Sequence, residues 1–181
     1  MASCGARQAP EVIAPGWERG AVPGLQGARV LLLPVQDPGG VEGIDEEIEF
    51  ALSGASAHVT WVGSRTLARL TSEAGRLGAN PRDLPVGAFE RGRLDRIGDP
   101  LFGSVYRLAA FADAGIVLLP LSARAAVGDS GRETIVVDLL LLDPRTGRVM
   151  WQGLVEGPGG APGTRAPAAG VAEQIAERLV R

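Results

Sequence analysis

The strongest constraint on the fold is a pair of strand patterns joined by a tight turn, over residues 132–157 (RETIVVDLLLLDPRTGRVMWQGLVEG). Within the turn sequence DPRTG, Pro144 suits the first corner and Gly147 can adopt a positive φ. A turn of this kind joins neighbouring strands that run antiparallel. These residues therefore predict a β-hairpin near the C-terminus.

The rest of the chain alternates strand-sized apolar runs with helical patterns. Strands are predicted where short runs are rich in apolar and β-branched residues, over residues 28–35, 57–63 and 116–127. Helices are predicted where apolar side chains recur at helical spacing, over residues 44–55, 64–75, 99–115 and 168–181. The predicted fold class is α/β (α+β): a single mixed sheet of about five strands with helices packed on it, a C-terminal antiparallel hairpin and a closing helix.

The expected helix ends follow from capping residues. Asp99 suits the N-cap of the helix over 99–115, Pro100 suits its first position, and Gly115 is expected to end it. Ser64 is the expected N-cap of the helix that follows the second strand.

Length and composition fit one globular domain with a tail. The 181 residues are 45% hydrophobic and 22% charged, which is enough to bury a core. No run of 18 apolar residues occurs, so we expect no membrane-spanning helix. The net charge of −3 is scattered and only 4% of residues are aromatic, so we expect no nucleic-acid partner.

The first 27 residues differ from the remainder. Residues 5–27 contain three prolines and five glycines without an apolar period, which predicts an extended tether or a segment that wraps a partner. We therefore divide the chain into an N-terminal anchor and tether, 1–27, and an α/β domain, 28–181. Trp17 is unusual in a linker, and it either pins the tether to its own domain or contacts a partner.

A search for catalytic residues finds no constellation. His58 is the only histidine, no G-x-S-x-G motif is present, and a hydrolase that uses His58 with a carboxylate is a weak alternative. A lone histidine with no cysteine beside it cannot complete a zinc site. We predict that the protein is not an enzyme and has no metal and no cofactor.

The loop before the first helix offers a different alternative. Residues Gly39–Gly43 precede a helix N-terminus, and such positions bind phosphate. The loop lacks the motifs of a P-loop or a dinucleotide site, and acidic residues such as Asp37 and Glu42 would repel phosphate. A cytoplasmic domain that binds a small ligand or nucleotide through Gly39–Gly43 is the alternative function.

A local positive patch lies in the irregular stretch from 78 to 98. It is formed by Arg91, Arg93 and Arg96. The patch is a candidate contact for anionic lipid or an acidic partner, and a solvated loop is the other interpretation.

Three segments resemble, in order, the landmarks of a group of bacterial envelope lipoproteins. They are ARVLLLPVQD, AFADAGIVLLPLSARA and VVDLLLLDPRTGRVMWQGLVEG. The group includes the curli-secretion lipoproteins, the lipoprotein activators of penicillin-binding proteins, and the N-terminal domain of the Tol-system propeller protein. The hairpin is the most specific part of the resemblance, with five residues in the expected places: Asp143, Thr146, Gly147, Trp151 and Gly153.

The resemblance implies a domain without catalysis that acts through partners in the cell envelope and carries an N-terminal lipid anchor. In MASCG, small residues precede Cys4 and Gly5 follows it, as in a lipobox, although Met1 stands where leucine is expected. Cys4 is then the lipid attachment site, and the alternative is an incidental thiol. The protein would lie lipid-anchored on the periplasmic face of a bacterial membrane.

Such a protein would dock on an envelope protein or serve as a peripheral subunit of a larger membrane complex. The candidate partner-binding residues are Trp17, Arg91, Arg93 and Arg96. The membrane hairpins with which curli-secretion proteins build a pore have no counterpart here. The stretches 78–98 and 157–167 match nothing in the group, and we expect partner-specific contacts there, because loops on a rigid scaffold carry such contacts.

Overall fold

The computed structural model describes residues 14–180, except 56–57, 75–77, 88 and 90–93. The helices and strands within these residues are, in chain order, β1 (Glu18–Gly20), β2 (Arg29–Leu32), α1 (Ile44–Ala55), β3 (Thr60–Val62), α2 (Ser64–Ala74), α4 (Leu101–Phe111), β4 (Ile116–Val127), β5 (Glu133–Asp143), β6 (Arg148–Glu156) and α5 (Ala166–Val180).

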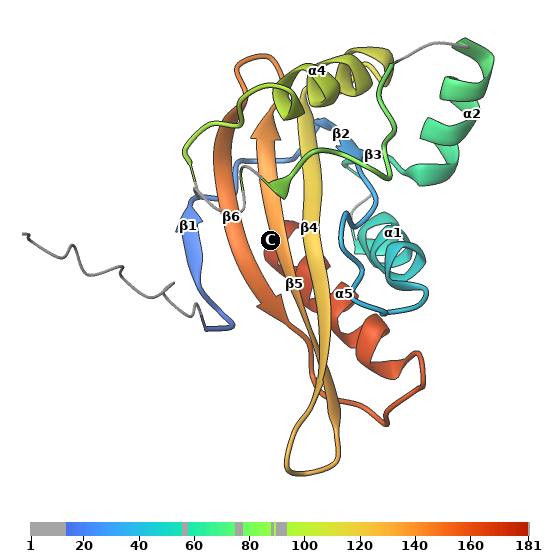
Figure 1. The fold of residues 1–181 in the computed structure, drawn as a ribbon, viewed down its shortest axis with the longest axis vertical. Helices are drawn as coiled ribbons and strands as arrows, with labels where there is room; N and C mark the ends of the chain where they lie inside the picture. Colours follow the sequence, from blue (N-terminus) through green and yellow to red (C-terminus); the bar gives the residue numbers. More distant parts are fainter. Residues whose placement is uncertain (1–13, 56–57, 75–77, 88, 90–93, 181) are drawn as a thin grey trace, which may run out of the picture.

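The strands form a mixed six-stranded sheet in the order β1-β6-β5-β4-β2-β3 (Figure 1). β2 pairs in parallel with β3 and β4, and the pairs from β4 to β1 are antiparallel. The predicted fold class, with its C-terminal hairpin and closing helix, is confirmed. The sheet has one strand more than the expected number of about five.

The additional strand, β1, lies in the segment that was predicted to be a tether. Its residues Glu18 and Gly20 pair with Gly153 and Trp151 of β6. Leu25, farther along the same segment, is only 4% exposed. Residues 14–27 thus lie against the domain, which corrects the expectation for this part. The division at residue 28 otherwise stays a prediction, and residues 1–13 lie outside the described residues.

A glycine bulge starts the pairing of β1. Gly16 has a φ of 85°, which favours glycine. Its N–H donates to the Leu154 carbonyl at 2.9 Å, and the Leu154 N–H donates to the Trp17 carbonyl at 2.9 Å. Gly16 and Trp17 therefore both lie opposite Leu154, as in a G1 bulge. The bulge sets the register in which Trp17 faces Leu154.

Helices cover the two faces of the sheet unequally. On one side, here called the α1/α5 face, both helices pack on apolar side chains of the central strands. On the other side, the α4 face, a second cluster joins α4 to the loop before it and to β2, β4 and β5. Figure 1 shows α4 across the upper end of the sheet, whereas α5 lies behind the sheet.

Both ends of α4 differ from expectation. α4 begins after Pro100 and ends at Phe111, four residues before Gly115, because Asp113 adopts a left-handed φ of 52°. The Asp99 carboxylate still accepts a hydrogen bond from the Gly103 N–H at 3.1 Å.

The predicted hairpin turn is confirmed between β5 and β6. Gly147 has a φ of 70°, and its N–H donates to the Asp143 carbonyl at 2.9 Å. The Asp143 carboxylate accepts hydrogen bonds from the Arg145 N–H at 2.9 Å and from the Thr146 hydroxyl at 2.8 Å. Each residue of the turn sequence except Pro144 therefore makes a bond that closes the turn.

Asp143 gives the turn a predictable pH dependence. Burial opposes ionisation, but hydrogen bonds from the Thr146 hydroxyl and two backbone N–H groups lower the pKa of Asp143 below its ordinary 3.8. The stabilisation is therefore present above pH 3.8 and is lost as the pH falls through the folded-state pKa. We expect Asp143→Ala to lower the free energy of unfolding by about 1 kcal/mol at pH 7.

Urea unfolding of both proteins at pH 7 and at strongly acid pH measures this effect. The difference between Asp143→Ala and the wild type should shrink at acid pH. Asp83→Ala also removes one negative charge, but at an exposed loop residue. It should leave the free energy of unfolding at pH 7 unchanged. An equal loss from Asp143→Ala at both pH values would contradict the role of the carboxylate.

Candidate functional site

The α4 face of the sheet is covered over only part of its length. α4 lies across the upper ends of the strands (Figure 1), and a helix is only about 10 Å thick. β4 has 12 residues and is therefore about 40 Å long. The core beneath α4 reaches Leu121 on β4 and Leu140 on β5. Below these residues, the strands carry side chains that none of the helices α1, α2, α4 and α5 covers.

Strand register decides which side chains lie on this uncovered part. Asp138 and Val136 precede Leu140 by two and four residues, so they share its face. Directly opposed residues also share a face, and Asp138 is opposite Ser122 on β4 and Leu154 on β6. We call the uncovered part the open sheet face, and it comprises Trp17, Arg19, Ser122, Arg124, Thr134, Val136, Asp138, Leu154 and Glu156.

The open sheet face combines half-buried apolar side chains with a polar row. Trp17, Val136 and Leu154 are half-buried. Beside them lies Gln152, which is only 1% exposed. Its side-chain amide donates a hydrogen bond to the Asp138 carboxylate at 3.0 Å and accepts one from the Arg19 guanidinium at 3.5 Å. Aromatic and apolar side chains next to arginine are typical of protein–protein contact surfaces.

The upper rim of this surface is the segment 94–97. The Val149 N–H donates to the Asp95 carbonyl at 2.9 Å, so the segment lies beside β6 above β1. Arg19 of β1 connects that strand to the segment 94–97: one of its nitrogens lies 3.0 Å from the Asp95 carboxylate and another lies 2.9 Å from the Leu94 carbonyl. Leu94 is 55% exposed, and Arg96 is exposed and forms a backbone bridge with Arg148.

The structure separates the two candidate partner residues that it describes. Trp17 lies on the open sheet face opposite Leu154. Arg96 is bridged to Arg148 and therefore lies on the other face of the sheet, because Arg148 alternates with Val149 of the α4 face. The other predicted residues, Cys4, Arg91 and Arg93, lie outside the described residues. Their roles stay predictions.

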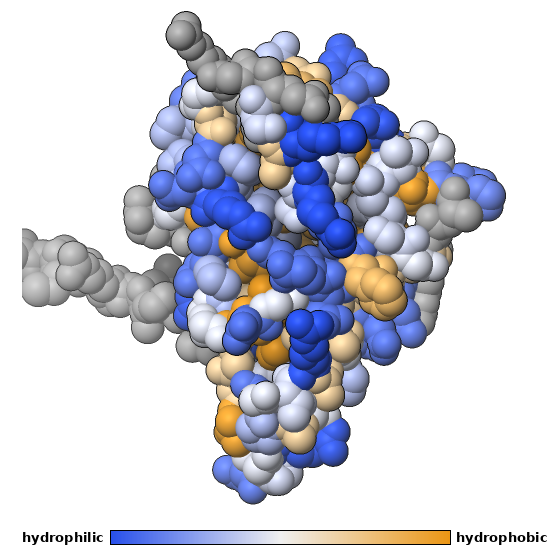
Figure 2. Space-filling model, turned by 90° about the vertical axis from the view of Figure 1, so that its right-hand side faces the viewer, coloured by the Kyte–Doolittle hydropathy of each residue, from blue (hydrophilic) through white to orange (hydrophobic). Residues whose placement is uncertain are grey.

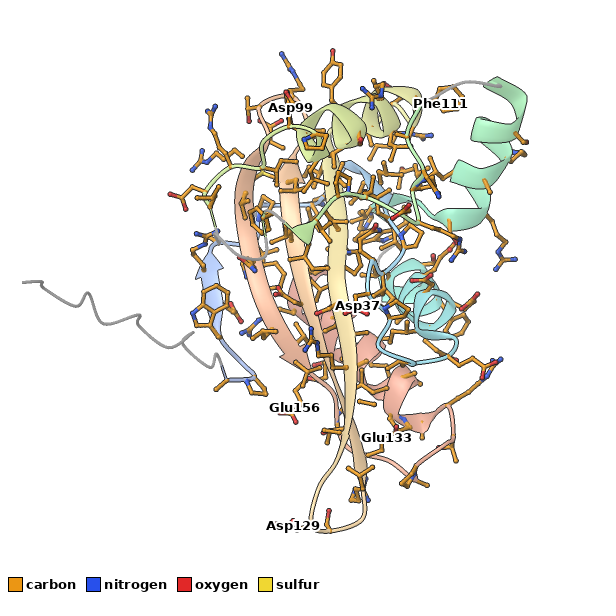
Figure 3. The ribbon with its side chains drawn as sticks, in the orientation of Figure 1. Asp37, Asp99, Phe111, Asp129, Glu133 and Glu156 are labelled. Atoms are coloured by element: carbon orange, nitrogen blue, oxygen red, sulfur yellow. The ribbon has the colours of Figure 1, made fainter. Side chains whose placement is uncertain are left out.

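Exposed ion pairs border the surface. Arg124 lies 3.8 Å from Asp37, and both side chains are more than half exposed; Asp37 and Glu156 can be located in Figure 3. The Asp95 partner of Arg19 is almost fully exposed. Exposed pairs contribute little to stability, so these charges can exchange partners with a docking protein at small cost.

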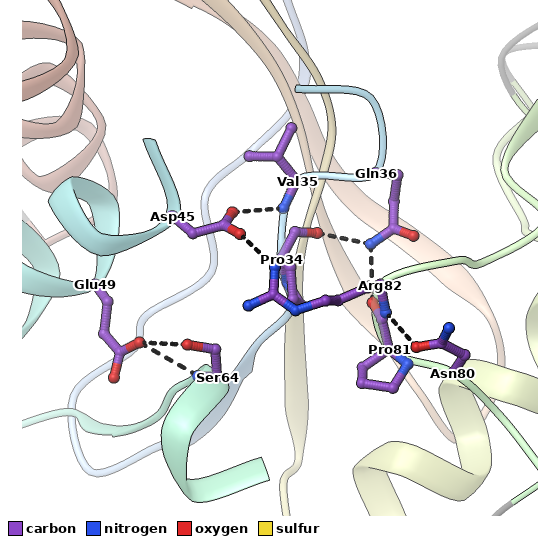
Figure 4. Close-up of polar contacts among 9 residues, drawn as sticks. All are labelled: Pro34, Val35, Gln36, Asp45, Glu49, Ser64, Asn80, Pro81 and Arg82. Carbon is purple, nitrogen blue, oxygen red and sulfur yellow. Dashed lines mark hydrogen bonds and ion pairs between the residues drawn. The ribbon is translucent and has the colours of Figure 1, made fainter. Parts of the chain in front are cut away.

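The cleft between α1 and α2 is a second candidate site. It has a volume of about 730 Å³ and lies at the carboxyl ends of parallel strands, where open sheets bind ligands. Figure 4 shows its polar contacts. The Asp45 carboxylate accepts from the Val35 N–H at 2.8 Å and pairs with Arg82 at 3.3 Å. Glu49 accepts from the Ser64 N–H and hydroxyl at 3.3 and 2.9 Å.

These polar groups fasten the chain to itself. Burial raises the pKa of Asp45 above 3.8, and the Val35 N–H and Arg82 act against it. The Gln36 side chain bonds the Pro81 carbonyl at 3.1 Å and the Leu84 N–H at 2.8 Å. Together, these bonds hold the segment 80–84 to the end of β2, and Glu49 supplies the capping oxygen expected from Ser64. We assign this cleft a structural role.

The loop Gly39–Gly43 lines a separate cleft of about 650 Å³ beside α5. Gly39 lies against the Ala123 carbonyl of β4 with a φ of 53°, so its role is close packing. Glu42, Glu46 and Glu133 line the cleft with a single arginine, Arg165. This excess of carboxylates disfavours phosphate, so the arrangement does not support nucleotide binding.

Three further findings bear on the sequence predictions. His58 lies exposed in the turn before β3, where its carbonyl accepts a hydrogen bond from the Gly27 N–H at 2.8 Å. Across the described ranges, no three His, Cys, Asp or Glu side chains gather closely enough to hold a metal ion. No helix in that part of the chain is long and apolar enough to cross a membrane.

Sequence reasoning missed Val136 and Leu154 as surface residues. Both lie in continuous apolar runs, where the alternation between the two sides of a strand cannot be seen. The signal that could have found them is Asp138, a charged residue among seven apolar neighbours, which marks the side of β5 that faces water.

No protein-family model and no curated protein matches the sequence. Three solved structures are similar in fold. The C-terminal domain of LpoB from Salmonella enterica is 19% identical, with a TM-score of 0.49, over 75% of this chain and 86% of that one. The PelC dodecamer from Paraburkholderia phytofirmans is 16% identical, with a TM-score of 0.48, over 91% and 97%. Lipoprotein GNA1162 from Neisseria meningitidis is 15% identical, with a TM-score of 0.44, over 76% and 84%.

These structural neighbours lie in the group of envelope lipoproteins that the sequence resembles. At 15–19% identity, the likeness is one of fold alone.

Proposed function

We propose that this protein is a non-enzymatic accessory protein of the bacterial cell envelope. A lipid on Cys4 would hold it to the periplasmic face of a membrane, and the open sheet face would dock on another envelope protein, either singly or within a larger complex. The observation that carries the proposal is a sheet face that none of the helices α1, α2, α4 and α5 covers, on which Trp17, Val136 and Leu154 lie beside arginines.

Two sequence features support the envelope setting. The hairpin residues shared with envelope lipoproteins include Trp151 and Gly153, and the structure gives their spacing a physical reason. A side chain at position 153 would come within 2.7 Å of the Trp151 ring, so only glycine leaves room for the indole. The second feature is the small-residue context of Cys4.

The anchor is tested by Cys4→Ser in the native cell. We expect the wild type to sediment with membranes and the variant to move largely into the soluble fraction, because a single acylated residue would provide the attachment. Intact mass of the wild type should show a chain that begins at Cys4 with added acyl groups. An unmodified, soluble wild type would refute the anchor and leave the docking surface to be judged separately.

Docking is tested by placing a photoreactive side chain at Val136 or Leu154. We expect each position to crosslink one envelope protein, whereas the same group at exposed Asp83 should not. Leu154→Arg should reduce the Val136 adduct at least tenfold, because a charge replaces a central apolar contact. Equal crosslinking from Asp83, or none from the open sheet face, would contradict the docking proposal.

A further inference from the structure

The α1/α5 face carries an apolar groove on its outer side. The two helices lie side by side, with their N-termini at the same end, because Arg165, just before α5, pairs with Glu47 in the first turn of α1 at 3.8 Å. The groove along their seam has a volume of about 540 Å³. It lies on the side opposite the open sheet face and does not depend on the function proposed above.

Small residues form the floor of the groove. They recur along both helices at helical spacing: Ala51, Gly54 and Ala55 on α1, and Ala169 and Ala176 on α5. Small side chains let another helix backbone approach closely and pack between two existing ones. The α5 side of the groove runs from Ala169 to Val180, which is about 16 Å and therefore three helical turns.

An exposed phenylalanine stands at one edge. Phe50 is 80% exposed, and it lines both this groove and the neighbouring cleft between α1 and α2. A docked helix would remove this apolar surface from water. Figure 2 shows, on the side of the molecule turned to the viewer, hydrophobic patches that lie between hydrophilic side chains.

The charge of the rim indicates the chemistry of the occupant. Glu47, Glu173 and Glu177 line the groove, and no arginine or lysine lines it within the described residues, although Arg165 beyond its end pairs with Glu47. A cationic partner would be attracted by this rim, whereas an anionic lipid surface would be repelled. Two copies of the chain that met groove to groove would place their glutamates against each other.

We propose that this groove binds an amphipathic, basic α-helix of a partner protein. The helix is about three turns long, with large apolar side chains along one stripe and arginine or lysine on both flanks. The apolar stripe fills the space above the small residues, and the flanking cations lie beside Glu173 and Glu177 of α5.

The test uses the purified protein and a synthetic 14-residue peptide. The peptide carries leucines at helical spacing and flanking arginines, and fluorescence anisotropy measures its binding. Two matched peptides have glutamates in place of the arginines, or a central proline. We expect the arginine peptide to bind at least tenfold more tightly than either.

Two variants locate the binding. At Gly54 an added Cβ meets no atom within 4 Å, so Gly54→Leu fills the groove without strain and should weaken binding at least tenfold while the thermal midpoint is kept. Glu173→Lys should weaken the arginine peptide and strengthen the glutamate peptide. Asp129→Lys, the same charge change at the far tip of the β4–β5 arm (Figure 3), should leave affinity within twofold.

Several results would overturn the proposal. These are equal binding of the arginine and glutamate peptides, full binding of the proline peptide, and unchanged binding to Gly54→Leu. A concentration-dependent dimer that Gly54→Leu abolishes would also overturn it, because the occupant would then be a second copy of this chain.

Discussion

Replacing Trp151 with alanine is expected to lower the free energy of unfolding by about 3–5 kcal/mol. Trp151 is 1% exposed and packs between the sheet and the α1/α5 layer. Its indole N–H also donates to the Glu18 carboxylate of β1 at 3.4 Å. The variant therefore loses core packing and a tie between β1 and β6. Guanidinium unfolding followed by circular dichroism measures the loss.

Trp61 provides the matched comparison. It is half-buried on the edge strand β3, and its indole nitrogen is buried without a hydrogen-bond partner among the described residues. Trp61→Phe removes that unsatisfied group and should cost nothing, or should stabilise by up to about 1 kcal/mol. Trp151→Phe loses a hydrogen bond and should destabilise. Equal effects of the two phenylalanine variants would count against the bond to Glu18.

Gly157→Ala should be nearly as damaging, at about 2–3 kcal/mol. Gly157 is buried after β6, and an added Cβ would lie 2.6 Å from the Val171 Cα of α5. The glycine cannot move away easily, because its N–H donates to the Ile135 carbonyl at 3.1 Å. The overlap must therefore be relieved by a shift of α5, which hydrogen exchange along α5 would reveal.

Gly24→Ala is the control for this substitution. An added Cβ at Gly24 meets no atom within 4 Å, and the residue has no positive φ. The change should therefore leave stability within about 0.5 kcal/mol of the wild type. If Gly157→Ala were as mild as Gly24→Ala, the close contact between the β6 end and α5 would be refuted.

The hairpin could be predicted because its signals are local. Asp143, Pro144 and Gly147 specify the turn within five residues, and the flanking apolar runs specify strands. β1 could not be predicted in this way, because Glu18–Gly20 is polar and only three residues long. Its pairing depends on the free edge of β6, which lies more than 130 positions away in the sequence.

The same distinction applies to the candidate site. Trp17 and Arg96 could each be singled out by residue type, as an aromatic in a linker and a basic residue in an irregular loop. Their positions along β6 could not, because Arg19 and Asp95 meet only after both of their segments have paired with the same edge of β6. The open sheet face exists because α4 is shorter than the strands on which it lies. This relation is set when the helix packs on the sheet, so it cannot be read from any one segment of the sequence.

The three-residue strand β1 also determines how the protein bears mechanical load. Among the described strands, β1 is the first that a pull from the N-terminal side reaches. It is held by three residue pairs with β6 and by side-chain contacts of Glu18 with Trp151 and Arg178 and of Arg19 with Asp95. It therefore yields before the core does. Its release would free the stretch from Ala14 to Leu25, which spans at most roughly 40 Å when extended, and would uncover the edge of β6 for another strand.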